Sequence, residues 1–233
     1  MVRISTLILS IAFLLWGGAS YAASFEDGVE AHKRGDFSNA LRIFRLVAEQ
    51  GDPTAQYNLG AMYHIGEGVL QDYKEALKWY RMSADQGIAS AQFNLGLMYS
   101  NGEGVPQDYK EALKWYRMSA DQGIASAQLN LGLMYSNGEG VPQDYKEALK
   151  WYRMSAEQGN AKAQFNLGLM YSNGNGVPQD DVYAHMWWNI SGSNGHEQAT
   201  NDRDLVAKAM TKEQIAEAQK FAGECVKKNY KDC

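Results

Sequence analysis

The centre of the chain has the pattern of two helices separated by a loop. Residues 91–99 contain no β-branched side chain and place apolar residues at helical spacing, which predicts a first helix. The glycine- and proline-rich stretch 102–107 predicts a loop, and we expect Gly102 to end the first helix in the left-handed conformation. A second apolar pattern predicts another helix from residue 109 to about residue 122, ended by Gly123.

The second of these helices begins with a capping signal. Asp108 stands at the expected N-cap, and Glu111 three residues later completes the sequence signature of a capping box. The same signal recurs as Asp72 with Glu75 and as Asp144 with Glu147. Because such a cap contributes about 1 kcal/mol, each unit specifies the start of its own second helix.

The two-helix unit repeats with a period of 36 residues. Residues 91–126 recur at 127–162 with four substitutions and are preceded at 55–90 by a copy with five, and a more diverged copy covers 163–198. A fixed period of this length is typical of stacked supersecondary units. The sequence therefore predicts an all-α solenoid instead of a single globular core.

The two ends of the chain depart from the repeat. Residues 1–22 carry one early arginine, an apolar stretch and small residues before Ala22, as a secretory signal peptide does. The apolar stretch is shorter than the roughly 20 residues of a membrane-spanning helix. Residues 23–54 predict a helix pair with a short, tetratricopeptide-like loop, and residues 199–233 predict capping helices and a tail. We expect an exported protein, periplasmic or secreted after cleavage near Ala22, with no membrane span in the mature chain.

Charge and cysteine content narrow the class of partner. The chain carries 22 Lys and Arg against 27 Asp and Glu, a net charge of −5. This balance argues against nucleic acid as the main partner, because phosphate contacts need a basic surface. Cys225 and Cys233 are the only cysteines. In an exported protein they can form a disulfide, and two free thiols on the tail are the alternative.

The recurring residues resemble the Sel-one-like repeat (SLR) family. The match rests on Ala91, Leu95-Gly96, Tyr99, the Gly102-x-Gly104-Val105 loop, Asp108, Ala112, Trp115-Tyr116, Ala120 and Gly123. The resemblance implies a right-handed superhelical solenoid with four repeats at 55–90, 91–126, 127–162 and 163–198. It also implies a non-catalytic adaptor, of the kind that exported bacterial members provide in regulation at the cell envelope and in contact with host cells.

The first helix of each repeat carries a second apolar stripe, opposite the positions that match the family. In the repeat at 91–126 the stripe consists of Phe93 and Leu97, flanked by Asn94 and Asn101. The counterparts in the other repeats are Tyr57, Leu129, Asn130, Leu133, Asn137, Phe165 and Leu169. We interpret these residues as a concave groove for a protein or peptide partner, with amides for its backbone and apolar steps for its side chains. Burial between neighbouring repeats and self-association are the alternatives, and the oligomeric state stays open.

The second helix carries a stripe of cations. Lys110, Lys114 and Arg117 lie on one side of the helix and recur in two other repeats. They permit a polyanion as partner, such as an anionic lipid or glycan. We favour a solvated face, because Glu111 and Asp121 stand at pairing distance along the helix from Lys114 and Arg117.

The tryptophans and the last repeat indicate packing. Trp79, Trp115 and Trp151 lie on the face of the second helix that is expected to pack on the first helix. The fourth repeat is the most aromatic part of the chain. We expect two terminal helices, at 197–210 and 211–228, to cover it, because terminal repeats need caps.

Little in the sequence predicts catalysis. The four histidines, His32, His64, His185 and His196, are scattered, and HExxH, CxxC and GxSxG motifs are absent. We therefore expect no metal, no cofactor and no enzymatic activity. The alternative is a cell-wall-associated enzyme or glycan-binding module, since some cysteine-rich SLR proteins have been described as binding or hydrolysing β-lactams. Those relatives carry a cysteine pair in each repeat, which this chain lacks.

Overall fold

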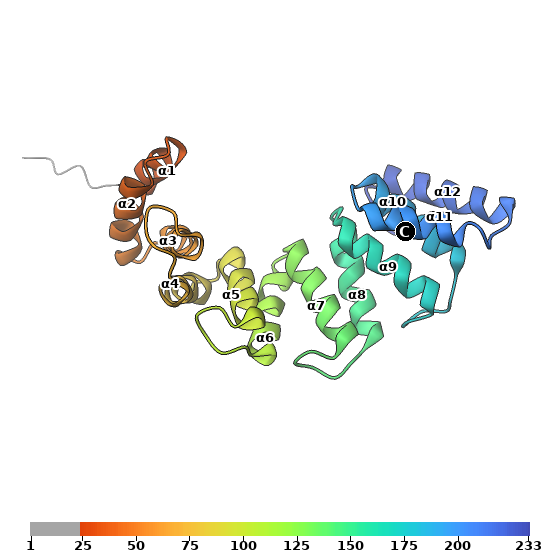
Figure 1. Ribbon diagram of the computed structural model, residues 1–233, viewed down its shortest axis with the longest axis horizontal. Helices are drawn as coiled ribbons and strands as arrows, with labels where there is room; N and C mark the ends of the chain where they lie inside the picture. Colours follow the sequence, from red (N-terminus) through yellow and green to blue (C-terminus); the bar gives the residue numbers. More distant parts are fainter. Residues whose placement is uncertain (1–23) are drawn as a thin grey trace, which may run out of the picture.

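The computed structural model describes residues 24–233, and all regular structure in that range is α-helical (Figure 1). The first two pairs are α1 (Phe25–Lys33) with α2 (Phe37–Glu49) and α3 (Pro53–Ile65) with α4 (Tyr73–Asp85). The next two are α5 (Ala89–Asn101) with α6 (Tyr109–Asp121) and α7 (Ala125–Asn137) with α8 (Tyr145–Ala156). The chain ends with α9 (Ala161–Asn173), α10 (Asp181–Ser193), α11 (Glu197–Val206) and α12 (Lys212–Lys227). The predicted signal peptide at 1–22 lies outside the described residues.

The helices stack in chain order along a curved row (Figure 1). From α1 to α10 each helix packs on the next one in the chain, and α12 packs back on α10. The hydrophobic core is therefore continuous along the row, with a share in every repeat. The predicted all-α solenoid is confirmed. In each repeat we call α3, α5, α7 and α9 the first helices and α4, α6, α8 and α10 the second helices.

The helix ends follow the capping residues closely. Helix α5 extends two residues beyond the predicted 91–99 at each end. Its start lies earlier because the carbonyl of Ile88 already accepts the first helical hydrogen bond, and at its other end the helix continues up to Gly102. Gly102 ends it with φ 74°, in the left-handed conformation that was predicted. Helix α6 matches its predicted span, and Gly123 follows it with φ 92°.

Only one of the two interactions of the predicted capping box at α6 is present. The Asp108 carboxylate accepts from the backbone N–H groups of Lys110 and Glu111, at 2.9 and 3.1 Å. The Glu111 side chain does not return to the N-cap and lies instead 3.7 Å from the ammonium group of Lys114. Helix α12, in contrast, begins with a complete box between Thr211 and Gln214.

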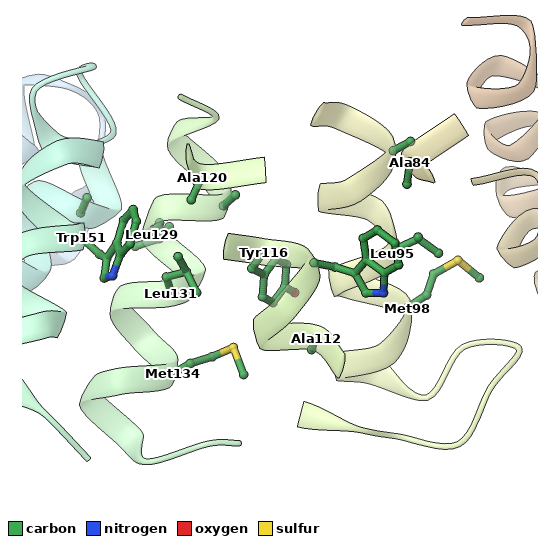
Figure 2. Packing of buried hydrophobic residues seen from close by; sticks show 14 of the residues in the cluster. Ala84, Leu95, Met98, Ala112, Tyr116, Ala120, Leu129, Leu131, Met134 and Trp151 are labelled. Carbon is green, nitrogen blue, oxygen red and sulfur yellow. The ribbon is translucent and has the colours of Figure 1, made fainter. Parts of the chain in front are cut away.

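A glycine inside each first helix lets the pair pack closely. A Cβ atom at Gly96 would lie 2.4 Å from the ring of Tyr116, so only glycine admits this ring against the helix. The same contact recurs between Gly60 and Tyr80, between Gly132 and Tyr152, and between Gly168 and Trp188. Figure 2 shows Tyr116 between the helix that carries Leu95 and the helix that carries Leu131. The Tyr116 ring thus contacts α5 of its own repeat and faces α7 of the next repeat.

The aromatic residues occupy the packing positions predicted for them. Trp79, Trp115 and Trp151 are between 3% and 6% exposed. The last repeat is covered by α11 and α12, as expected of a terminal cap. Helix α11 ends at Val206 and not at the predicted residue 210, because residues 208–210 donate to carbonyls three positions back, in tight turns.

Candidate functional site

The predicted groove residues differ in exposure. Leu129 is only 7% exposed and belongs to the core, whereas Leu133, one turn later on the same helix, is 36% exposed. The remaining apolar members, Tyr57, Phe93, Leu97, Phe165 and Leu169, are half-buried. Of the amides, Asn94 and Asn130 are half-buried, and Asn101 and Asn137 are exposed. The stripe therefore forms a surface wall that is largely apolar, with Leu129 as its buried support.

A hollow of about 460 Å³ crosses three successive first helices. Its lining includes Phe93 and Leu97 of α5, Leu129 and Asn130 of α7, and Lys162 at the start of α9. Three helices that converge on one hollow present a continuous surface across the repeats. We refer to this hollow as the Phe93 hollow.

A second hollow, of about 240 Å³, lies beside the first on the loop side of the repeats. It contains Leu97, Asn101, Asn130, Leu133 and Glu139, together with Ser100, Tyr116 and Met134. Leu97 and Asn130 border both hollows, so the two are adjacent. We refer to the second as the Glu139 hollow.

The structure thus brings six of the predicted residues together: Phe93, Leu97, Asn101, Leu129, Asn130 and Leu133. The other five lie outside both hollows. Tyr57 packs beside Tyr80, with ring centroids 5.8 Å apart. Phe165 stacks on His196 at 4.4 Å, so the cap covers this end of the stripe. The remaining three predicted residues, Asn94, Asn137 and Leu169, also line neither hollow.

A buried tyrosine hydroxyl lies at the base of the Glu139 hollow. Burial raises the pKa of Tyr116 to about 12, and hydrogen bonds with Asn130 and Ser100 oppose this shift. The hydroxyl is therefore neutral at physiological pH and can donate or accept a hydrogen bond. In the next repeat, burial likewise raises the pKa of Tyr152 to about 12, and Ser136 opposes the shift.

Two of the three cations on α6, Lys114 and Arg117, have partners within the chain. Lys114 lies 3.7 Å from Glu111 and 5.2 Å above the ring of Trp115. The predicted pairing of Arg117 with Asp121 is wrong, because Arg117 donates instead to the hydroxyl of Tyr135 in the next repeat. Arg45, Arg81 and Arg153 make the same bond to Tyr63, Tyr99 and Tyr171. The arginines of the cation stripe therefore serve the contact between repeats, whereas Lys114 is paired within its own helix.

Two features escaped the sequence analysis. An exposed apolar row runs along α2, α4, α6 and α8 and consists of Leu46, Met82, Met118 and Met154, each 36–42% exposed. The 36-residue spacing of these four residues is visible in the sequence and could have indicated the row. The second feature is a pair of histidine contacts across repeats, from His32 to Glu67 at 2.8 Å and from His64 to Glu103 at 2.9 Å. The residues of each pair are more than 30 positions apart, so the sequence alone did not indicate that they are in contact.

The two C-terminal histidines serve the cap and do not meet. His185 is 3% exposed, and its Nδ1 atom has no hydrogen-bond partner among the described residues. His196 caps α11 by accepting from the N–H of Ala199. Within residues 24–233, no group of three or more His, Cys, Asp or Glu side chains could hold a metal ion. No helix in the same range is long and apolar enough to cross a membrane.

The tail is folded back on the last repeat. Cys225 and Cys233 are joined in a disulfide. Tyr230, between them, donates its hydroxyl to the side-chain oxygen of Asn194 at 3.2 Å. The disulfide therefore holds the tail against the turn that follows α10.

Comparison with known proteins identifies the repeat. The model of the Sel1 repeat family matches residues 53–88, 89–124, 125–160 and 161–196. These repeats have the predicted period and begin two residues before the predicted ones, and the division of the remaining chain stays a prediction. No curated protein matches the chain.

Two solved structures share both the fold and part of the sequence. A Sel1 repeat protein from Oxalobacter formigenes is 34% identical, with a TM-score of 0.74 over 86% of this chain and 84% of its own. The protective antigen c5321 of uropathogenic Escherichia coli, which displays an SLR fold, is 35% identical, with a TM-score of 0.78. That match covers 88% of this chain and 46% of the antigen. With four matched repeats and these structural relatives, the chain belongs to the Sel1 repeat family.

Proposed function

We propose that this protein is a non-catalytic protein-interaction scaffold of the bacterial cell envelope. Its partner is a protein segment that binds across the first helices. The observation that carries the proposal is the Phe93 hollow, which residues of three successive repeats line together. In it the half-buried side chains of Phe93 and Leu97 lie beside the amide of Asn130. Apolar steps suit the side chains of an extended segment, and the Asn130 amide suits its backbone.

The repetition of the surface supports the same function. Leu97 and Asn130 each border two adjacent hollows, so one bound segment can contact several repeats at once. Several weak contacts of this kind add up to useful affinity, because each one raises the effective concentration of the next. Sel1 repeats are typical protein-interaction modules, which agrees with this assignment.

The test is an in-cell crosslinking capture with a groove variant that keeps its fold. The variant carries Phe93→Ser, Leu97→Ser and Leu133→Ser. Leu129 stays unchanged, because it is only 7% exposed and its loss would destabilise the core. We expect the wild-type protein to capture a discrete partner that this variant does not capture, with circular dichroism confirming that the variant is folded.

A control variant with matched exposure comes from the opposite helices. Met82, Met118 and Met154 are 40%, 39% and 36% exposed, close to Leu133 at 36%. Replacing all three with serine removes similar apolar surface from the second helices. The proposal requires this control to retain the partner. Equal capture by the wild-type protein and the groove variant would move the site away from the first helices.

The envelope assignment depends on residues 1–22. The short apolar stretch before Ala22 supports export through a signal peptide. We expect the cell-fractionated protein to appear in the periplasm or the medium with a mass that corresponds to cleavage near Ala22. A full-length protein in the cytoplasm would contradict the envelope role and leave the binding surface as a separate question.

A further inference from the structure

We propose that the Glu139 hollow is a subsite for a basic side chain of the bound protein segment. An arginine or lysine would pack its aliphatic stem on Leu97 and Leu133 and bring its cationic head to Glu139. This inference rests on the proposed function, because it assigns a chemistry to one part of the same surface.

The two preceding repeats show what fills this position within the chain itself. In the loop after α5, Glu103 accepts from Asn101 at 3.1 Å with one carboxylate oxygen and pairs with His64 at 2.9 Å through the other. One repeat earlier, Glu67 pairs with His32 at 2.8 Å. In both cases an imidazole of the preceding helix pair lies against the loop carboxylate.

The third repeat keeps the carboxylate but lacks the imidazole. Glu139 accepts from Asn137 at 3.1 Å, just as Glu103 accepts from Asn101. Ser100 stands where His64 stands in the preceding repeat, one period of 36 residues earlier. The second carboxylate oxygen of Glu139 has no cationic partner in residues 24–233, and the space that an imidazole would occupy is the Glu139 hollow.

The surroundings of this hollow favour a cation with an apolar stem. Leu97 and Leu133 supply apolar wall, and Lys and Arg stems pack on such surface while the charged head seeks a polar partner. Both Glu103 and Glu139 act electrostatically on Tyr116 at the base of the hollow, so its field is negative. Lys162 lines the Phe93 hollow and not the Glu139 hollow, so the two signs of charge belong to different hollows.

The fourth repeat lacks both groups, the loop carboxylate and the histidine that would pair with it. There the loop residue is Asn175 and the position of the histidine is Ser136, so neither the carboxylate nor the imidazole is present. Among the four matched repeats, Glu139 is therefore the only loop carboxylate that no histidine of the preceding helix pair contacts.

The test compares two dipeptide probes that differ only in charge. N-acetyl-leucyl-arginine amide and N-acetyl-leucyl-citrulline amide share shape and hydrogen-bonding groups, but only the first carries a cation. Nitrogen–proton correlation spectra of the mature protein would follow the backbone signals of Glu139 and Gly140. We expect the arginine probe to shift these signals with an affinity about fivefold higher than that of the citrulline probe.

Three variants separate the subsite from general groove binding. Glu139→Gln should abolish the preference for arginine and leave the leucine contacts at Phe93 and Leu97 unchanged. Ser100→His should also abolish it, because the new imidazole can pair with Glu139 as His64 pairs with Glu103. His64→Ser should create a second arginine response, at Glu103.

Two results would overturn the inference. One is equal affinity of the wild-type protein for both probes, or no shift at Glu139 with either. The other is an arginine preference that persists in Glu139→Gln. In either case, loss of partner capture in the groove variant would still support the proposed function, so the two failures are distinguishable.

Discussion

The side chains of Gln92 and Gln122 form a hydrogen bond of 2.7 Å that ties a first helix to the end of its second helix. Gln92 is 1% exposed, and its amide nitrogen also donates to the carbonyl of Ala84 in the preceding repeat, at 3.2 Å. One buried amide therefore joins two repeats. The same arrangement recurs at Gln56, Gln128 and Gln164.

Replacing Gln92 with leucine should destabilise the protein by about 1 kcal/mol, because the carbonyl of Ala84 loses one of its two donors and keeps only the backbone N–H of Gly87. Urea unfolding followed by circular dichroism measures the change. Gln107→Leu is the control, since Gln107 is exposed and its hydrogen bonds to the carbonyl of Ser100 and the hydroxyl of Tyr109 are exposed to water. A loss in the control as large as that in Gln92→Leu would contradict the assigned role.

Gly96→Ala should destabilise the protein by about 2 kcal/mol, although alanine is the better helix former. The added methyl group would lie 2.4 Å from the Tyr116 ring. Gly223 in α12 is the matched control, because a Cβ atom there has no neighbouring atom within 4 Å. Gly223→Ala should stabilise the protein by up to about 1 kcal/mol. Thermal unfolding of both variants would show opposite shifts, and shifts of the same sign would refute the packing argument.

His185 should make the C-terminal cap sensitive to acid. Burial lowers the pKa of His185 below its ordinary value of 6.5, and Arg203 lowers it further, while Asp204 opposes the shift. The folded state therefore holds a neutral imidazole, while the unfolded chain takes up a proton below pH 6.5. Stability is fully present above that pH and falls as the pH drops toward the lowered pKa of the folded state.

The measurement is the free energy of unfolding in urea at about pH 7.5 and at about pH 5. We expect the wild-type protein to lose about 1 kcal/mol more over this interval than His185→Leu does. Comparing the two pH values within each protein removes the constant effect of the substitution. Identical pH dependence in both proteins would show that His185 does not titrate on unfolding.

Reduction of the Cys225–Cys233 disulfide should loosen the tail. The bond closes a loop with a sequence separation of 8 residues, and a loop of this size is worth about 2 kcal/mol. We expect a reductant to lower the thermal midpoint and to speed amide exchange at Tyr230, which bonds to Asn194 in the folded tail. A Cys225→Ala/Cys233→Ala double variant should behave like the reduced protein and be insensitive to reductant.

The sequence by itself determined the repeat and its local structure. The 36-residue period implied a solenoid, and Gly102 and Gly123 marked the helix ends where the structure has them. The helical spacing also assigned Trp115 to the core. These features follow from backbone conformation and from the faces of single helices, which local sequence encodes directly.

The tertiary structure decided how neighbouring repeats meet. Leu129 is buried and Leu133 is exposed on the same predicted stripe, because burial there depends on the angle at which successive pairs stack. For the same reason Arg117 donates a hydrogen bond to Tyr135 of the next repeat and does not pair with Asp121. The Glu139 hollow is also of this kind, since its walls come from two first helices and a loop of different repeats. A periodic sequence specifies each unit well, but contacts between units depend on their relative orientation, which no single unit contains.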